Sequence, residues 1–142
     1  MQSFARWTGG MGFEGKFSTG HDIKMGTSVD QGGGDTGPRP IEMLLMGLAG
    51  CTGMDTIAIL QKKRQKISSF QVTVTGERRE EQPRVFTHVK VTYEVKGENL
   101  DVEAIRQAVH LSEEKYCSVS NMLKKAIPIV YEIRVKKDGA AR

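Results

Sequence analysis

Residues 40–66 read Pro-Ile-Glu-Met-Leu-Leu-Met-Gly-Leu-Ala-Gly-Cys-Thr-Gly-Met-Asp-Thr-Ile-Ala-Ile-Leu-Gln-Lys-Lys-Arg-Gln-Lys, and this stretch decides the fold. Pro40 suits the first position of a helix, where a backbone N–H would have no partner. Apolar residues follow on almost every side, which is typical of a buried helix. Basic residues between Lys62 and Lys66 favour the C-terminal end, where the helix dipole is negative. The stretch therefore predicts a long central helix over about 40–66.

Cys51 lies in the middle of this predicted helix among small residues, namely Ala49, Gly50 and Gly53. A glycine inside a helix costs about 1 kcal/mol relative to alanine, so a packing or functional reason is expected. Small neighbours would let another backbone or a small ligand approach the sulfur. The sequence therefore marks Cys51 as a candidate functional residue.

Strand patterns precede the helix in residues 3–25, where apolar residues alternate with polar or small ones. Gly9-Gly10 and residues 19–22 are turn signals that divide this segment. The segment therefore predicts short strands joined by hairpin turns.

The chain beyond the helix predicts two more strands, two helices and a last strand. Apolar residues alternate through residues 70–95, interrupted by a charged turn. Asp101 and Ser118 are good N-cap residues for two helices within about 102–126. Alternation returns in residues 127–135.

This order of elements predicts an α+β fold with antiparallel sheets, formed by one domain over residues 1–142. The last residues, 136–142, are expected to fray. The central helix is apolar on more sides than one small sheet can cover. A second copy of the chain is therefore expected to cover the rest.

The bulk properties narrow the classes of function. The net charge of +4 is mild, and the basic residues are not interleaved with aromatic ones, which argues against a nucleic-acid partner. A basic module that binds nucleic acid is left as a third alternative on charge alone. The sequence contains no uninterrupted apolar run of about 18 residues, so no membrane-spanning helix is expected. The first residues lack the pattern of a signal peptide, so a cytoplasmic location is expected.

The two cysteines, Cys51 and Cys117, are 66 positions apart. This is neither a CxxC motif nor a metal-ligand spacing, so no metal is expected. Two buried structural thiols are the simplest interpretation. However, Cys117 directly precedes the expected Ser118 cap. A helix N-terminus there would lower the pKa of the thiol and leave an accessible thiolate.

Together the two thiols have the composition of a peroxide-reducing pair, in which one forms a sulfenic acid and the other condenses with it to a disulfide. Such a site needs a cation to hold the thiolate and a carboxylate to orient the cation. Glu42 lies nine residues before Cys51, about 13 Å away along the helix axis. Any role of Glu42 would therefore need a bridging group, such as Arg39, Arg6 or a residue of a partner chain. The alternative for Glu42 is an acid that stabilises the first helical turn.

Two segments resemble motifs of the OsmC/Ohr family, and of its YhfA-like branch in particular. These are Gly-Pro-Arg-Pro-Ile-Glu-Met-Leu-Leu-Met-Gly-Leu-Ala-Gly-Cys-Thr-Gly-Met-Asp at 37–55 and Glu-Glu-Lys-Tyr-Cys-Ser-Val-Ser at 113–120. The resemblance implies the OsmC-like fold as an intertwined homodimer. It also implies reduction of organic hydroperoxides, with Cys51 as the peroxidatic and Cys117 as the resolving cysteine. No metal or other cofactor is implied, and the external reductant would be a dithiol, often lipoyl-linked.

The chain departs from the hydroperoxide-resistance branch at two positions. That branch has an arginine after Thr-Gly-Gly, where this chain has Met11. It also has its glutamate directly after the helix proline, where this chain has Ile41 and places Glu42 one residue later. The shift turns the carboxylate by about 100° around the helix.

Three functions follow as hypotheses. The first is a cysteine-based peroxidase for organic hydroperoxides, in which Glu42 and Arg39 support the cysteines. The second is a binding protein for a small apolar or thiol-reactive molecule, held in a pocket beside Cys51. The third is the basic module described above.

Overall fold

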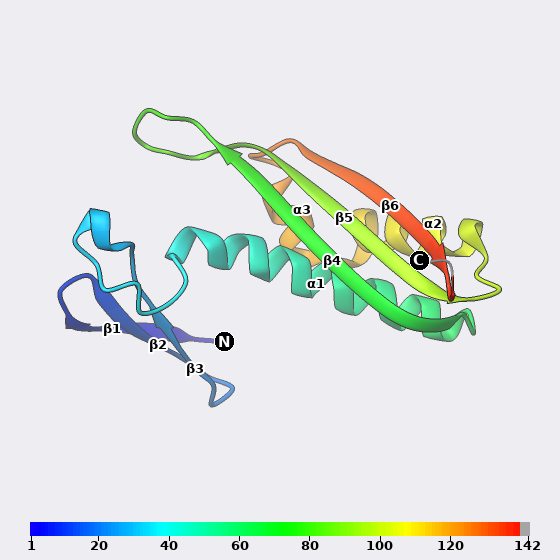
Figure 1. Cartoon of the computed structure of the whole chain (residues 1–142), viewed down its shortest axis with the longest axis horizontal. Helices are drawn as coiled ribbons and strands as arrows, with labels where there is room; N and C mark the ends of the chain where they lie inside the picture. Colours follow the sequence, from blue (N-terminus) through cyan, green and yellow to red (C-terminus); the bar gives the residue numbers. More distant parts are fainter. Residues whose placement is uncertain (140–142) are drawn as a thin grey trace. The chain divides into compact units, whose positions relative to one another are not determined.

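The computed structural model describes residues 1–139, and the chain forms two compact units, Met1–Leu44 and Leu45 onward (Figure 1). The long helix α1, Pro40–Lys62, begins in the first unit and continues into the second. The single domain expected over residues 1–142 stays a prediction.

The first unit contains an antiparallel sheet of three strands, β1 (Ser3–Gly9), β2 (Gly12–Phe17) and β3 (Asp22–Met25), in that order. The turn between β1 and β2 needs left-handed backbone at Gly9 and Gly10, with φ of 109° and 53°. The strands predicted for residues 3–25 are thus confirmed. A short 3₁₀ helix, η1 (Val29–Gln31), follows.

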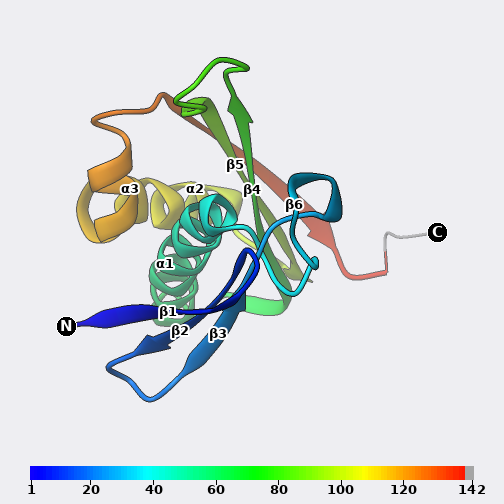
Figure 2. The same cartoon turned by 90° about the vertical axis from the view of Figure 1, so that its left-hand side faces the viewer.

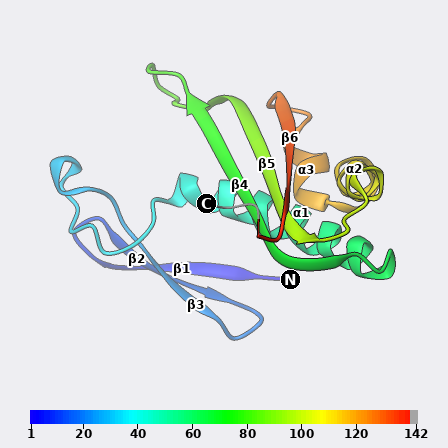
Figure 3. The ribbon, with the colours of Figure 1, turned by 45° about the vertical axis from the view of Figure 1, so that its right-hand side comes forward.

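The second unit contains a sheet of β4 (Lys66–Arg78), β5 (Phe86–Glu98) and β6 (Ile129–Lys137), in that order (Figure 3). β4 and β5 form the predicted antiparallel hairpin. β6 instead runs parallel to β5, so the prediction of purely antiparallel sheets is wrong at this pair. The reason is the connection: the helices between the two strands form a crossover, which parallel strands require.

Three helices lie on one face of this sheet in the second unit (Figure 2). α1 ends at Lys62, four residues before the predicted end, because Arg64 adopts a left-handed conformation with φ of 54°. α2 (Val102–Leu111) begins as predicted at Asp101, whose carboxylate accepts the N–H groups of Glu103 and Ala104. A single π-helical turn, η2 (Ser112–Tyr116), and α3 (Ser118–Leu123) follow.

The core of the second unit lies between this sheet and its helices. Its centre is formed by Leu60 of α1, Val95 of β5, and Ile105 and Ala108 of α2, all fully or almost fully buried. The alternating residues of β5 point into this core, as the sequence pattern predicts. The core fixes α1 against the sheet and thereby positions Cys51.

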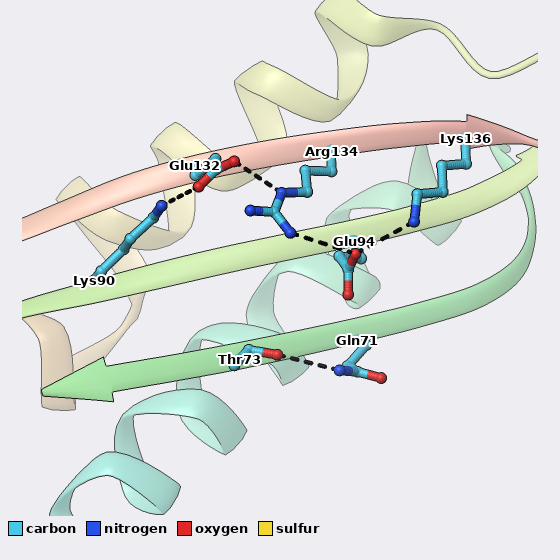
Figure 4. A network of polar contacts seen from close by, with 7 residues as sticks. All are labelled: Gln71, Thr73, Lys90, Glu94, Glu132, Arg134 and Lys136. Atoms are coloured by element: carbon cyan, nitrogen blue, oxygen red, sulfur yellow. Dashed lines mark hydrogen bonds and ion pairs between the residues drawn. The ribbon is translucent and has the colours of Figure 1, made fainter.

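The opposite face of this sheet carries charged side chains (Figure 4). Lys90 of β5 pairs with Glu132 of β6, and Arg134 contacts both Glu132 at 2.8 Å and Glu94 at 3.9 Å. Two hydrogen bonds between the side chains of Arg134 and Lys90 and the carboxylate of Glu132 lower the pKa of Glu132 to about 2. The sheet therefore has one apolar and one charged face.

α1 is long and apolar enough to meet the length and hydropathy of a membrane span, with a mean hydropathy of 1.7 over 18 residues. Glu42 and Asp55 interrupt the apolar run within this helix, as expected from the sequence. The core helix of a folded domain meets the same test. Leu48 and Leu60 of α1 are fully buried, so this helix is part of the packed second unit.

Candidate active site

The structure brings Cys51 and Cys117 together in the second unit. Both sulfur atoms and a carboxylate oxygen of Asp55 lie within 4.8 Å of one another. The cysteines are free thiols; Cys51 is half-buried and Cys117 is fully buried. A dithiol at this separation can form a disulfide with a small movement of the side chains.

Local structure explains how the three side chains meet. Asp55 follows Cys51 by four residues in α1, so both occupy the same helix face. Cys117 ends the π-helical turn η2, where its N–H donates to the carbonyl of Ser112 over 2.8 Å. Such turns are frequent at functional sites. Here the turn carries the Cys117 sulfur to the face of α1 that holds Cys51.

The cap of α3 is Cys117 rather than Ser118, which corrects the prediction from the sequence. The Cys117 Sγ accepts the N–H of Ser120 over 3.3 Å. The sulfur can act as the cap because the residue before α3 is extended, with φ of −69° and ψ of 104°.

The predicted low pKa and accessibility of the Cys117 thiol are also wrong. Burial, opposed by the Ser120 N–H, raises the pKa of Cys117 to about 11, and hydrogen bonding to Cys51 adds to the rise. The sequence indicated the favourable helix N-terminus but not the loss of water around the sulfur. Desolvation outweighs a single hydrogen bond to a thiolate.

Buried hydroxyl groups hold η2 and α3 in place around the thiols. The Thr52 hydroxyl lies 2.6 Å from the Tyr93 hydroxyl and 2.8 Å from the Ser112 hydroxyl. The Ser120 and Tyr131 hydroxyls lie 2.7 Å apart. These contacts join α1, β5, β6 and the turn that carries Cys117, so they fix the separation of the two sulfurs.

Glu113 of η2 has a carboxyl group whose pKa is raised. Burial raises the pKa of its carboxyl to about 7, the charge of Glu114 adds to the rise, and Lys124 opposes it. The charge of Glu113 contributes in turn to the raised pKa of Tyr93 and of Tyr131, for which burial is the main cause. Glu113 therefore changes charge near neutral pH beside the hydroxyl groups that hold the site.

Asp55 is the residue of this site that sequence reasoning missed. Its Oδ2 is buried and has no hydrogen-bond partner among the described residues. Its position four residues after Cys51 was the signal in the sequence that could have indicated it. That spacing indicates a shared site only once Cys117 is known to lie beside the same helix face.

The glycines beside Cys51 leave space that the chain itself does not fill. A Cβ atom at Gly50 would meet nothing within 4 Å. At Gly53 it would make ordinary contact with Val72 at 3.4 Å. The approach of a ligand or a second chain to this region stays a prediction.

Glu42 and Arg39 interact with each other in the first unit. The Glu42 Oε2 accepts the backbone N–H of Arg39 over 2.8 Å and lies 4.0 Å from the Arg39 Nη1. This is the backward contact of a capping box, which supports the first-turn interpretation of Glu42. Arg6, the other bridging candidate, pairs with Glu14 at 2.7 Å. A supporting role of Glu42 and Arg39 at the thiols stays a prediction.

Comparison with known proteins gives the family. The family model described as OsmC-like protein matches residues 32–132, which include both cysteines. This chain belongs to the OsmC family. Protein YhfA of Escherichia coli strain K12 is 44% identical to this OsmC-like chain over 135 residues, covering 95% of this chain and 98% of YhfA.

Solved structures support the same OsmC-like fold. A hypothetical protein from Aquifex aeolicus VF5 is 31% identical, with a TM-score of 0.84 and 96% of each chain covered. The organic hydroperoxide resistance protein OhrB of Bacillus subtilis is 21% identical, with a TM-score of 0.63, covering 94% of this chain and 96% of OhrB. The second likeness shows a shared fold only.

Proposed function

We propose that this OsmC-like protein is a thiol-dependent reductase of organic hydroperoxides that acts in the cytoplasm. The observation that carries the proposal is the separation of the two sulfurs, which lie within 4.8 Å of each other. The shared fold with an organic hydroperoxide resistance protein supports an alkyl hydroperoxide as the substrate.

The exposure of the two cysteines supports different roles for them. Cys51 is half-buried, so a hydroperoxide can reach its sulfur, whereas Cys117 is fully buried. The Cys51 thiolate attacks an oxygen of the hydroperoxide, the O–O bond breaks, the alkoxide takes up a proton and leaves as an alcohol, and Cys51 becomes a sulfenic acid. The Cys117 thiolate then attacks the Cys51 sulfur, the S–S bond forms, and water leaves. An external dithiol of the lipoyl type reduces this disulfide and becomes a disulfide itself.

The resolving step has a predicted pH dependence. The pKa of Cys117 is about 11, so only a small fraction of this thiol is ionised near neutral pH. Because the thiolate is the nucleophile, the rate of disulfide formation rises about tenfold per pH unit below that pKa. Trapping of the Cys51 sulfenic acid with dimedone checks this prediction: the trapped fraction falls as pH rises. A trapped fraction that does not change with pH contradicts it.

The homodimer belongs to the same proposal. Met46 and Met54 of α1 have exposed fractions of 66% and 74%, which supports a partner for this helix. A second copy could also supply the cation that the thiolate needs, alongside Glu42 and Arg39. Light scattering coupled to size exclusion measures the oligomeric state directly.

The deciding experiment measures free thiols and intact mass after a modest excess of cumene hydroperoxide. We expect both thiols to disappear and each chain to lose two hydrogens. Cys51→Ser abolishes consumption of the hydroperoxide, whereas Cys117→Ser still forms a sulfenic acid. Turnover in Cys51→Ser, or an unchanged mass of the wild-type chain, would overturn the proposal.

A second candidate function is binding of a small apolar or thiol-reactive ligand without turnover. A cavity of about 600 Å³ in the first unit favours it, although Cys51, beside which the sequence predicted the pocket, does not line this cavity. Glycines and the side chains of Met11 and Phe13 line this cavity, together with Glu14 and Lys24. A ligand that raises the melting temperature without consuming peroxide would support this function. A broad apolar panel without any thermal shift would exclude it.

A further inference from the structure

Asp55 presents a chemical problem that the peroxidase proposal does not solve. Its Oδ2 is buried without a partner, and an oxygen of its carboxylate lies within 4.8 Å of two sulfur atoms. A buried carboxylate oxygen without a hydrogen bond destabilises the folded chain, and more so when the carboxylate is charged. Thiolates formed beside it would add negative charge. The cluster therefore favours a cation.

We propose that Cys51, Asp55 and Cys117 form a binding site for a thiophilic divalent cation of the zinc class. Two sulfurs and one carboxylate oxygen suit Zn²⁺, whereas Mg²⁺ and Ca²⁺ take oxygen ligands. A tetrahedral Zn²⁺ ion with these three ligands keeps a fourth position for water or another ligand.

The geometry is close to that of a bound site. Zinc bonds of about 2.0–2.3 Å place the ligand atoms of a tetrahedron roughly 3.3–3.8 Å apart. The three atoms already lie within 4.8 Å of one another, so binding would require them to approach by only about 1–1.5 Å. Cys51 and Asp55 project from successive turns of α1, so both side chains lie on one face of this helix.

Access and support also fit a metal site. Cys51 and Asp55 are half-buried, so a cation can enter beside them, while Cys117 forms the buried end. The N–H of Ser120 holds the Cys117 sulfur at 3.3 Å. A hydrogen bond to a ligating atom orients it, as outer partners do in metal sites.

Metal binding and peroxide reduction would use the same thiols in different ways. Binding of the ion displaces the two thiol protons and occupies both sulfurs without any change of oxidation state. Peroxide reduction oxidises the same sulfurs to a disulfide. The metal site therefore does not depend on the proposed function. Metal binding can be measured by titrating metal-free protein without peroxide, and peroxide reduction can be measured in metal-free protein.

The test is a titration of the full-length, reduced and chelator-treated protein with Co²⁺ under anaerobic conditions. We expect a near-ultraviolet thiolate-to-cobalt charge-transfer band and the strong visible bands of tetrahedral cobalt, saturating at one ion per site. Zn²⁺ should then displace Co²⁺ and bleach both. A saturable titration without charge transfer, or no binding, would overturn the proposal.

Three variants assign the ligands. Cys51→Ser and Cys117→Ser each weaken the charge-transfer band, and together they abolish it. Asp55→Asn keeps both thiols and nearly the same shape, and it lowers the affinity for Co²⁺ at least about tenfold. Glu114→Gln is the matched control, because Glu114 is a nearby exposed carboxylate, and its affinity stays at the wild-type value. Wild-type affinity in Asp55→Asn would overturn the three-ligand site.

Discussion

The two units of this chain distribute their apolar residues in opposite ways. The second unit encloses an apolar interior, in which Val91, Tyr93 and Ile105 are fully buried. In the first unit, the described buried residues are glycines, while Phe4 and Trp7 of β1 have exposed fractions of 56% and 64%. One unit has a core, and the other has an apolar surface.

This difference teaches that the two units obtain stability from different sources. The second unit buries a connected group of apolar side chains, and burial of apolar area is the main favourable term in folding. A three-stranded sheet without such a core is marginal in water unless its apolar face is covered. The first unit is therefore where a second copy would contribute most, and the predictions below test this contrast.

The largest expected effect is the loss of a core side chain in the second unit. Ile105→Ala removes a fully buried side chain that packs with Leu60 and Val95. We expect the free energy of unfolding to fall by about 2–5 kcal/mol. Urea denaturation measures it. A loss below about 1 kcal/mol would mean that the second unit lacks a tight core.

The next effect concerns the exposed face of the first unit. Phe4→Ala removes an aromatic ring that a second copy would bury, a change of about 1.5–3 kcal/mol. We expect the dissociation constant of the proposed dimer to rise about 10- to 100-fold, measured by sedimentation of a dilution series in the analytical ultracentrifuge. Gln2→Ala, at the residue directly before β1, is the control and leaves it unchanged. Equal behaviour of the two variants would contradict a role of this face in self-association.

A smaller effect comes from Glu113 at the edge of the core. The pKa of this carboxyl rises from 4.5 to about 7 on folding, so the protonated form is the one that favours the folded state. Its contribution is complete below about pH 4.5 and is lost as pH rises through 7. We expect the unfolding free energy to fall across this window by an amount on the order of 1 kcal/mol, after allowance for partial solvation.

Glu113→Gln stays neutral and should lack this decline, which denaturation at about pH 5 and about pH 8 would reveal. Glu103→Gln, an exposed first-turn residue of α2, is the control and keeps the wild-type pH dependence. A variant of Glu113 that declines as the wild type does would assign the effect to another group.

The smallest effect is expected on the charged face of the β4–β5–β6 sheet. Glu94→Gln weakens contacts to Arg134 at 3.9 Å and Lys136 at 3.6 Å. Exposed pairs contribute little, so we expect a loss of about 0–1 kcal/mol that shrinks as salt is added. Urea denaturation at low and high salt measures it. A loss comparable to that of Ile105→Ala would contradict the contrast between the two faces.

Much of the fold could be predicted because alternation reports burial directly. The pattern around Val91, Tyr93 and Val95 gave both the strand β5 and its buried face. The direction of β6 could not be read in the same way, since alternation is identical in parallel and antiparallel strands. Only the docking of α2 and α3 on the sheet decides that direction.

The site was predictable in its residues but not in its environment. The resemblance to a known family named Cys51 and Cys117, and the structure brings their sulfurs together. Local sequence indicated a helix N-terminus at Cys117 but carried no information about desolvation, which reversed the direction of its pKa shift. Asp55 was overlooked because its place in the site depends on contact with Cys117, which is 62 positions away in the sequence.

The helical crossover between β5 and β6 has a consequence for the order of events during folding. Cys117 lies within that crossover, so we expect its sulfur to reach Cys51 only after a long loop has closed. Contacts of such large sequence separation form late. In a newly made chain, we expect the two thiols to stay apart and to form a close pair only when folding is complete. Pulsed alkylation during refolding would test this: Cys117 should lose its reactivity after the β4–β5 hairpin forms, and earlier protection would contradict this order.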